Sequence, residues 1–493
     1  MSIKAQLAYI FAKKVVRQTQ KWAHNPVATQ QKVFLKLIRQ AQHTQFGKDH
    51  CFEKIKTFRD FADLVPIKDY EALKPYFDKV VAGEQDVLWK GKPLYFAKTS
   101  GTTSGSKYIP LTKASLPEHI KAAQNAILHY INETKNASIV DRKMIFLQGN
   151  PTLESKNGIK HGRLSGIVAH FVPKYLQKNR LPSWKTNCID DWEHKVDAIV
   201  SETFSQDMGV ISGIPSWVLM YFEKLHQKSK MPITDLFPNF QLFIYGGVNY
   251  EPYRAKFEYL MGKKVDSIEL FPASEGFFAY QDRQDIPGML LLLNSGIFYE
   301  FVKASDFFDQ NPKRYTIGEV LLDENYVLII SSNAGLWGYN IGDTVQFVSL
   351  NPHRIVVSGR VKHFISAFGE HVIGKEVETA MAFALEGTTA SINEFTVAPQ
   401  ITPQQGLPFH EWCIEFENEP QNIIAFAAKI DAKMREQNAY YDDLIVGKVL
   451  KSLEIRLIRK NGFQDYMKSI GKLGGQNKLP RLSNDRKIVD QLI

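Results

Sequence analysis

A short run of small and hydroxyl-bearing residues could bind phosphate. Residues 99–107 read T-S-G-T-T-S-G-S-K. Small residues let the backbone curl so that several N–H groups point at one anion. Hydroxyl groups and a lysine ammonium supply further donors and positive charge. The residues predicted to bind the phosphates of a nucleotide are Thr99, Ser100, Gly101, Thr102, Thr103, Ser104 and Lys107.

This segment lacks the spacing of a Walker P-loop. In that motif, G-x-x-x-x-G-K-[ST], the lysine directly follows the second glycine. Here only three residues separate Gly101 from Gly105, and Ser106 stands before Lys107. Tyr108 then occupies the place of the magnesium-binding Ser or Thr. A P-loop is therefore excluded, and the alternative interpretation is an ordinary polar turn.

Two acidic residues stand at strand ends where they could contact a nucleotide. Ser274 and Glu275 follow a strand-like run, where a hydroxyl can donate to phosphate and a carboxylate can bind Mg²⁺. Asp343 follows a glycine and precedes a strand, and an ionised carboxylate can accept both hydroxyl groups of a ribose. For each of them the alternative is a surface turn.

Basic residues stand at two places where the chain could move. Arg360 lies at a predicted domain junction and could hold phosphate or ribose, and Lys362 could serve as a hinge. Near the C-terminus, Lys478 follows two glycines and precedes a proline, so a mobile loop could carry it into a distant active site. The alternatives are a solvated linker for the first pair and a disordered tail for Lys478.

Strands and helices alternate along the first part of the chain, which indicates an α/β fold. Buried strands are predicted at 143–148, 209–212, 242–245 and 267–270, and a helix at 215–227. The strand at 242–245 ends at Tyr245, Gly246 and Gly247. Open α/β sheets bind their ligands at such an edge, so a ligand is expected there.

The pattern changes twice in the second part of the chain. Short alternating strands predict a small antiparallel barrel or sheet from 298–302, 318–322, 327–331, 344–350 and 353–358. Beyond it, helices are predicted at 374–385 and 423–438, and strands at 394–399, 411–417 and 450–459. We therefore expect a large multi-lobed N-terminal domain with mixed sheets, 1–359, and a smaller mobile α+β C-terminal domain, 360–493.

Composition narrows the class of protein. The 493 residues are 44% hydrophobic and 23% charged, as in globular proteins of more than one domain. A net charge of +9 favours anionic ligands, but the scattered basic residues do not predict nucleic-acid binding. Three widely spaced cysteines predict no disulfide framework or zinc site and fit the cytoplasm. Nothing demands an oligomer, so a monomer is expected.

The N-terminal segment 1–22 is basic and amphipathic, with Leu7, Ile10 and Phe11 among its apolar residues. It has no secretory signal pattern, and no run of the chain reaches the ~18 apolar residues of a membrane span. We expect a helix that packs on its own domain. The alternative is a helix that lies on a membrane surface.

The order of these segments resembles the motif order of one enzyme family. Residues 99–107, 271–275, 339–343 and 475–481 are similar to S-S-G-T-S-x-G-x-x-K, Y-x-S-S-E, Y-R-x-G-D and G-Q-Y-K-V-P-R. These motifs belong to the Gretchen Hagen 3 family of auxin-responsive acyl acid–amido synthetases, within the adenylate-forming superfamily of acyl-CoA synthetases and luciferases. The resemblance spans nearly the whole chain. It departs at Phe271, Ala273 and Asn340, where the family has Tyr, Ser and Arg.

The resemblance implies two half-reactions. A carboxylic acid attacks the α-phosphate of ATP, which gives an acyl-adenylate and pyrophosphate. An amine, usually that of an amino acid, then attacks the acyl carbon and gives an amide and AMP. ATP and Mg²⁺ are the implied cofactors. An acyl-CoA synthetase with a thiol acceptor and a non-catalytic nucleotide-binding protein are the alternatives.

The resemblance also implies roles for individual residues. Glu275 would hold Mg²⁺, Asp343 the ribose, and Arg360 a phosphate or the ribose. Lys478 would stabilise charge on the α-phosphate, and the C-terminal domain would rotate about Lys362 between the half-reactions.

The remaining implied contacts concern the base, the nucleotide and the acid. The residues expected to contact the nucleotide are Tyr245, Gly246, Gly247, Ser274 and Tyr339. The acyl pocket is expected along a helix that carries Trp217, Val218 and Tyr221. The alternative for these three residues is core packing, because apolar stripes on helices usually face the core.

Overall fold

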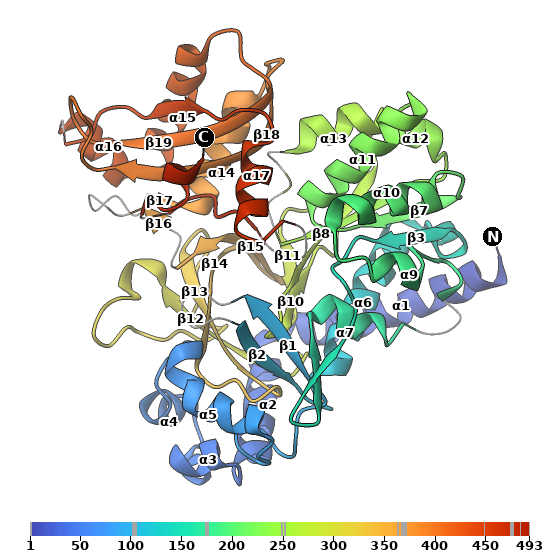
Figure 1. Cartoon of the computed structure of the whole chain (residues 1–493). Coiled ribbons are helices and arrows are strands. Elements are labelled where there is room, and N and C mark those ends of the chain that lie inside the picture. The colour runs from blue at the N-terminus through green and yellow to red at the C-terminus, as the bar shows by residue number, and fades with distance from the viewer. Residues whose placement is uncertain are drawn as a thin grey trace. The chain divides into compact units, whose positions relative to one another are not determined.

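The chain forms two compact units, each with a hydrophobic core of its own. The computed structural model (Figure 1) describes residues 2–100, 106–172, 177–247, 250, 253–361, 364–365, 372–447, 449–473, 478–483 and 485–492. The first unit comprises 1–247 and 264–356, and the second comprises 248–263 and 357–493. The division within the sequence lies close to the predicted boundary at 359/360. The assignment of 248–263 to the second unit had no counterpart in the sequence analysis.

An eleven-stranded mixed sheet is the centre of the first unit, which confirms the predicted α/β class. Its order is β12-β13-β14-β15-β11-β10-β9-β8-β7-β3-β6. The strands are β3 (Lys143–Phe146), β6 (Arg180–Leu181), β7 (Met208–Ser212), β8 (Leu242–Gly246), β9 (Asp266–Pro272), β10 (Phe277–Tyr280), β11 (Met289–Leu291), β12 (Ile297–Lys303), β13 (Asn325–Ser332), β14 (Tyr339–Leu350) and β15 (His353–Arg360). Strands β6, β3, β7, β8 and β9 are parallel neighbours. Strands were predicted at β3, β7, β8 and β9, whereas β6 was not predicted.

The antiparallel strands, expected as a separate small barrel or sheet, continue the parallel part of this sheet. They join it because β11 pairs with β10 on one side and with β15 on the other. The strand predicted at 318–322 is wrong, since this segment forms turns and only an isolated bridge from Leu322 to Phe347. Here the Glu319 carboxylate accepts hydrogen bonds from the backbone and hydroxyl of Thr316, and such local bonds compete with a strand ladder.

Helix α1 (Ile3–Ala23) packs on its own unit, as expected, and of its larger apolar residues Val15 is buried. Ala5 and Ala12 are fully buried in one cluster with α6 (Leu116–Thr134) and with residues of β7 and β8. Leu7, Ile10 and Phe11 are instead more than half exposed. Small side chains allow the close approach of α1 to α6, so the alanines face inward although they are less hydrophobic.

The other elements of the first unit surround the large sheet. Its remaining longer helices are α2 (Pro26–Ala41), α4 (Phe58–Leu64), α5 (Tyr70–Ala82), α10 (Trp192–Thr203) and α11 (Pro215–Ser229), and the short ones are α3 (Gln45–Asp49), α7 (Leu164–Ala169), α9 (Trp184–Asn187) and α12 (Ile233–Leu236). A second sheet has the order β2-β1-β5-β4, with β1 (Tyr95–Ser100), β2 (Ser106–Leu111), β4 (Glu154–Lys156) and β5 (Ile159–Gly162).

The second unit is α+β, as predicted. Its three-stranded sheet has the order β18-β19-β20, with β18 (Ser391–Gln400), β19 (Phe409–Asn418) and β20 (Glu454–Leu457). Its other elements are α13 (Arg254–Met261), β16 (Phe364–Ile365), β17 (Val372–Ile373), α14 (Gly374–Leu385), α15 (Ile423–Gln437), α16 (Ala439–Val446) and α17 (Gly462–Ser469). No helix in the described part of either unit is long and apolar enough to span a membrane.

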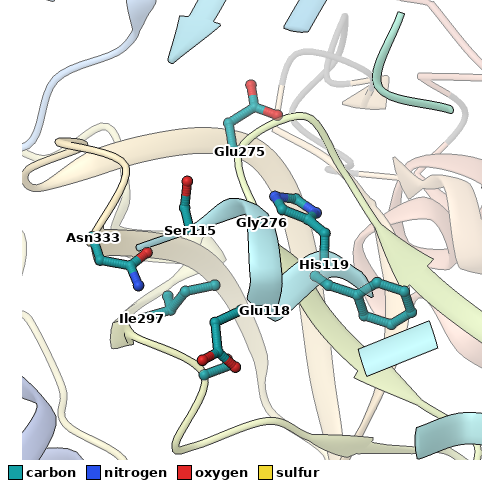
Figure 2. Close-up of a pocket in the computed structure, with 9 residues that line it drawn as sticks. Ser115, Glu118, His119, Glu275, Gly276, Ile297 and Asn333 are labelled. Carbon is teal, nitrogen blue, oxygen red and sulfur yellow. The ribbon is translucent and has the colours of Figure 1, made fainter. Parts of the chain in front are cut away.

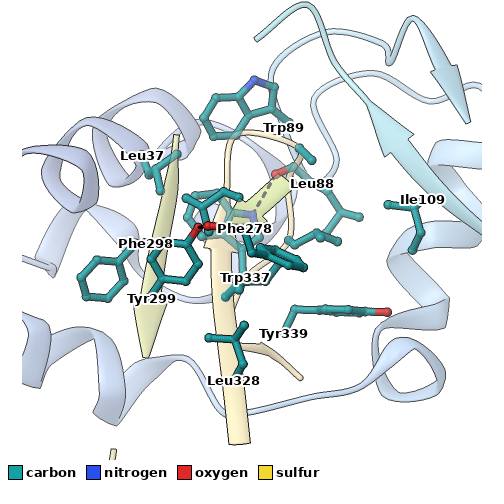
Figure 3. Packing of buried hydrophobic residues seen from close by; sticks show 14 of the residues in the cluster. Leu37, Leu88, Trp89, Ile109, Phe278, Phe298, Tyr299, Leu328, Trp337 and Tyr339 are labelled. Atoms are coloured by element: carbon teal, nitrogen blue, oxygen red, sulfur yellow. Dashed lines mark hydrogen bonds between the residues drawn. The ribbon is translucent and has the colours of Figure 1, made fainter. Parts of the chain in front are cut away.

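A tryptophan in the core of the first unit holds the start of β14 in place. Trp337 is fully buried, and its indole N–H donates to the carbonyl of Leu88 at 2.9 Å (Figure 3). The next residue, Gly338, donates its N–H to the Ser331 hydroxyl at 3.0 Å and accepts from the Lys68 N–H at 3.0 Å. The turn that precedes β14 is therefore fixed by three hydrogen bonds before Tyr339 begins.

A buried ion pair connects β12 to the end of α4. The Arg314 Nε donates to Glu300 at 2.7 Å, and its guanidinium also donates to the carbonyls of Val65 at 2.6 Å and Ala62 at 3.2 Å. Glu300 has no exposed surface, and burial raises the pKa of its carboxyl group against the opposing effect of Arg314. The arginine therefore compensates a carboxylate that cannot reach water.

We expect Arg314→Met to lower the free energy of unfolding of the first unit by about 3–5 kcal/mol, because an uncompensated buried charge remains. Urea unfolding followed by tryptophan fluorescence measures the change. Lys74→Met is the control, since Lys74 and Asp78 form an exposed pair at 2.6 Å and its loss should leave the midpoint unchanged. If Arg314→Met and Lys74→Met unfolded at the same urea midpoint, this would contradict the role of Arg314 in compensating the buried Glu300 carboxylate.

Candidate active site

The ends of the predicted phosphate loop belong to one hairpin. Strands β1 and β2 are antiparallel, and Thr99 pairs with Lys107 directly across the ladder. Gly101, Thr102, Thr103 and Ser104 lie outside the described residues, as does the side chain of Ser100. The structure thus places the first and last residues of the loop side by side.

An aromatic residue of α5 lies against the second strand of this hairpin. The ammonium of Lys107 lies 5.5 Å from the centre of the Tyr70 ring, and the backbone N–H of Tyr108 donates to the Tyr70 hydroxyl at 3.1 Å. Burial raises the pKa of Tyr70. The position of Lys107 is therefore tied to a rigid helix rather than to the loop alone.

The second and third predicted motifs lie close to each other. Glu275 stands in a tight turn between β9 and β10, which is closed by hydrogen bonds between Ala273 and Gly276 at 2.8 and 3.3 Å. Burial raises the pKa of Tyr339 well above its usual range, and the nearby charges of Glu275 and Asp69 raise it further. Tyr339 forms an isolated bridge with Lys68, two residues before the tyrosine whose ring Lys107 contacts. Tyr339 is thus a neutral group near Glu275, on a strand that pairs with the segment leading to Tyr70.

Asp343 lies at a bulge of β14. Asn340 pairs with Ile329 and Thr344 pairs with Val327, so the three residues 341–343 face the single residue Leu328. Bulges of this kind often re-aim side chains next to active sites. The Asn340 side chain accepts the N–H of Gly342 at 2.8 Å, and the backbone N–H of Asn340 donates to Lys68 at 2.9 Å. The residue that replaces the family's arginine therefore closes the turn that presents Asp343.

The predicted adenine-binding residues lie at the carboxyl end of β8. The Tyr245 ring is buried and stacks on Phe243, with centroids 5.4 Å apart. A Cβ at Gly246 would lie 2.4 Å from the carbonyl oxygen of Leu270, so no other residue allows the close pairing of β8 with β9. Gly247 has φ +89°, which only glycine adopts readily. Because β9 leads directly to Ser274 and Glu275, the two segments share one edge of the sheet.

A small cavity of about 10 Å³ lies under the Glu275 turn (Figure 2). It is lined by Ser115, Glu118, His119, Glu275, Gly276, Phe277, Ser295, Ile297 and Asn333. His119 is 5% exposed, and its Nδ1 has no hydrogen-bond partner among the described residues. Burial lowers the pKa of His119 to about 4, so its imidazole is neutral at neutral pH. Sequence analysis missed His119 because one histidine on a helix carries no spacing signal.

The acidic residues of this site suit Mg²⁺ only in company with a phosphate ligand. Within the described ranges, no group of three or more His, Cys, Asp or Glu side chains could hold a metal ion. Mg²⁺ is commonly held by one or two carboxylates together with substrate phosphates and water. Glu275 fits such a site as a protein carboxylate, and the oxygens of a nucleotide would complete it.

Family models match three segments of the chain, together well over half of its length. They describe the GH3 family N-terminal domain at 15–187, the central domain at 290–360 and the C-terminal domain at 375–487. The chain belongs to the GH3 family. The resemblance inferred from the four motifs is thereby confirmed.

The sequence relatives of this GH3 chain have low identity to it but match most of its length. It is 21% identical to the jasmonoyl–L-amino acid synthetase JAR4 of Nicotiana attenuata, over 85% of each chain. It is 20% identical to the indole-3-acetic acid-amido synthetase GH3.3 of Arabidopsis thaliana, over 97% of this chain and 93% of that protein. The solved structure of GH3.15 acyl acid amido synthetase has a TM-score of 0.79 at 14% identity and covers 97% of this chain and 95% of its own.

A structure from outside the family shares the fold less closely. 2-Hydroxyisobutyryl-CoA ligase in complex with its acyl-AMP has a TM-score of 0.56 at 12% identity, over 97% of this chain and 90% of its own. The GH3 chain thus has the fold of adenylate-forming enzymes, as predicted.

Two predicted site residues of the GH3 chain belong to the second unit. Arg360 ends β15, and Lys478 directly follows residues that lie outside the described part; both side chains are exposed. The predicted hinge Lys362 and residues 474–477 of the C-terminal motif are not described. The roles of Arg360, Lys362 and Lys478 stay predictions.

The residues predicted for the acyl pocket are buried in α11. The Trp217 ring lies 4.4 Å from that of Trp192 in α10, and the Tyr221 hydroxyl is hydrogen-bonded to Thr203 at 2.7 Å. Burial raises the pKa of Tyr221. Val218 has no exposed surface. These contacts account for the three side chains as parts of the core, and their contact with an acid stays a prediction.

The neutral His119 predicts a pH dependence of stability. The unfolded chain takes up its proton near pH 6.5 and the folded chain only near pH 4, so stability falls as pH falls through this interval. The loss is up to about 1.4 kcal/mol per pH unit. His119→Gln should show a weaker fall between pH 6.5 and 4 in urea titrations. The exposed His194→Gln should follow the wild type, and a His119→Gln curve parallel to the wild type would contradict a buried neutral imidazole.

Proposed function

We propose that this GH3 protein adenylates a small carboxylic acid with ATP and transfers the acyl group to the amine of an amino acid. The observation that carries the proposal is that Tyr339 lies near the Glu275 carboxylate and also pairs with Lys68, two residues before the Tyr70 ring that Lys107 contacts. This proximity supports a joint role for the predicted magnesium carboxylate and the predicted phosphate lysine. The names of the sequence relatives support an amino acid as the acceptor.

The first half-reaction requires two anions to approach each other. Lys107 and the hydroxyl-rich loop would neutralise the β- and γ-phosphates, which leave as pyrophosphate. Mg²⁺ held by Glu275 would polarise the phosphate oxygens and offset their charge. Tyr339, being neutral, would add no negative charge beside Glu275 and the triphosphate. The acid carboxylate would then attack the α-phosphorus, with Lys478 stabilising the added charge.

The remaining contacts would hold the nucleoside and prepare the second half-reaction. Asp343 would accept the ribose hydroxyls, Tyr245 to Gly247 would flank adenine, and Arg360 would contact ribose or phosphate. Rotation of the C-terminal domain about Lys362 would withdraw Lys478 and admit the amine. The amine attacks the acyl carbon, the acyl C–O bond breaks, and AMP leaves with the acid's oxygen. We infer a cytoplasmic location from three free cysteines, Cys51, Cys188 and Cys413.

Acid-dependent exchange of labelled pyrophosphate into ATP tests this function. A panel of aryl, indolyl and fatty acids should contain at least one that supports exchange, and added amino acids should then yield an amide and AMP detectable by mass spectrometry. Coenzyme A in place of the amino acid tests the thiol acceptor. ATP binding without exchange for any acid would contradict the enzymatic function, and a thioester product would contradict the amide assignment.

Lys478→Ala should lower the rate of pyrophosphate exchange by roughly 10²–10³-fold, because the charge contact acts mainly in the transition state. The Kd of ATP should change little. Lys487→Ala is the matched control, since Lys487 is an exposed lysine of the same C-terminal segment, paired with Asp485 at 3.0 Å. Exchange at the wild-type rate in Lys478→Ala would remove Lys478 from its assigned role.

A further inference from the structure

A segment between two strands of the first unit packs within the second unit. Residues 248–263 follow β8 directly and lead to β9, yet they belong to the second compact unit. The segment contains α13, and Tyr253 and Phe257 bury their side chains there, at 1% and 0% exposed. The chain therefore runs from the predicted adenine contacts at 245–247 straight into a part of the other unit.

The main polar partner of this segment is Arg481. The guanidinium of Arg481 donates to the Tyr253 hydroxyl, the Glu394 carboxylate, the Phe395 carbonyl at 3.0 Å and the Glu378 carboxylate at 3.3 Å. Its side chain is only 10% exposed. The guanidinium carbon also lies 4.7 Å from the Phe395 ring centre and 5.5 Å from that of Tyr253. All of these groups belong to the second unit.

The charges in this cluster balance in a way that keeps Arg481 ionised. Burial alone would lower the pKa of Arg481, but the carboxylate of Glu394 and the neighbouring Glu378 raise it above its usual value. Burial raises the pKa of Tyr253, so its hydroxyl stays protonated. The cluster is a charged network closed off from water, in which loss of a single partner leaves a buried group unsatisfied.

The same arginine fixes the backbone that follows Lys478. The carbonyl of Arg481 accepts the N–H of Val397 at 2.9 Å, and the N–H of Ser483 donates to the Val397 carbonyl at 2.9 Å. The Thr396 hydroxyl donates to the Pro480 carbonyl at 2.7 Å. Residues 480–483 thus lie alongside β18, with an isolated parallel bridge between Leu482 and Val397, and this segment begins two residues after Lys478.

A second contact ties the inserted segment to the same sheet. The Lys256 ammonium donates to the Asn393 side chain at 2.7 Å and lies 3.6 Å from the Glu417 carboxylate. The Lys256 side chain is 9% exposed. Residues 248–263 are therefore held at both Tyr253 and Lys256 to the strands that carry the segment after Lys478.

We propose that Tyr253 and Arg481 are positioning residues that couple helix α13 to the chain following Lys478. This inference rests on the proposed function, in which Lys478 acts on the α-phosphate. The Tyr253 hydroxyl holds the Arg481 guanidinium, and the Arg481 backbone holds residues 480–483 on β18. Lys478 is thereby held in place for the first half-reaction, whereas the second half-reaction does not use it.

Tyr253→Phe tests the coupling with the ring retained and only the hydroxyl removed. The kcat of acid-dependent pyrophosphate exchange should fall roughly 10- to 100-fold, because small misplacements of a charged group have effects of this size. The KM for ATP should change less than twofold. Transfer from a synthetic acyl-adenylate to the amino acid should keep its wild-type rate. Amide hydrogen exchange in 478–483 should become faster when ATP is bound.

Arg486→Gln is the matched control. Arg486 anchors the same C-terminal segment through Glu411 at 2.7 Å and Asp490 at 2.9 Å, but its described contacts lie away from 248–263. It should lower stability without separating the two half-reactions. Wild-type exchange kinetics in Tyr253→Phe, or equal losses in both half-reactions, would overturn the inference. A wild-type protein inactive with every acid would overturn the proposed function, and amide exchange in 478–483 then decides the coupling alone.

Discussion

The electrostatic interaction between Tyr339 and Glu275 is the interaction on which the site of the first unit depends. It joins the turn after β9 to the start of β14, two segments that are separated by β10 to β13 along the chain. The backbone around each residue is fixed by other contacts. The hydrogen bonds of Trp337 and Gly338 fix the chain just before Tyr339, and the closed turn from Ala273 to Gly276 fixes Glu275. The carboxylate therefore occupies a defined position before any ligand arrives, which is the preorganisation that charge stabilisation requires.

The negative charges of the two reactants explain why the position of the Glu275 carboxylate has to be fixed. An acid and a triphosphate repel each other, and a basic chain with a net charge of +9 offsets this only in a diffuse way. Groups at the site itself must therefore offset the remaining repulsion between the acid and the triphosphate. Lys107 over Tyr70 supplies positive charge, and the neutral Tyr339 and His119 add no negative charge near Glu275, the carboxylate suited to Mg²⁺. The mixed sheet supplies the scaffold, because the parallel strands β8 and β9 end at one edge, where the antiparallel strand β10 begins.

Much of this arrangement was accessible from the sequence. Parallel strands such as β8 are unbroken apolar runs, so their positions were predicted within two residues, and the motif order identified the family. The features that were not predicted have physical causes. The direction in which α1 packs depends on the small size of Ala5 and Ala12, which hydrophobicity alone does not reveal. The membership of 248–263 depends on Arg481, more than 200 residues later, and His119 becomes unusual only through burial. Such long-range contacts produce no periodic pattern in the amino-acid sequence.

The central claim is that the acid reacts at the α-phosphate of ATP and passes through an acyl-adenylate. The most direct test uses an acid that supports exchange, labelled with oxygen-18 in its carboxyl group, and reads the products by mass spectrometry. The account predicts that one labelled oxygen appears in AMP and that the amide keeps the other. Label in inorganic phosphate, with ADP as the nucleotide product, would show attack at the γ-phosphate and contradict the account.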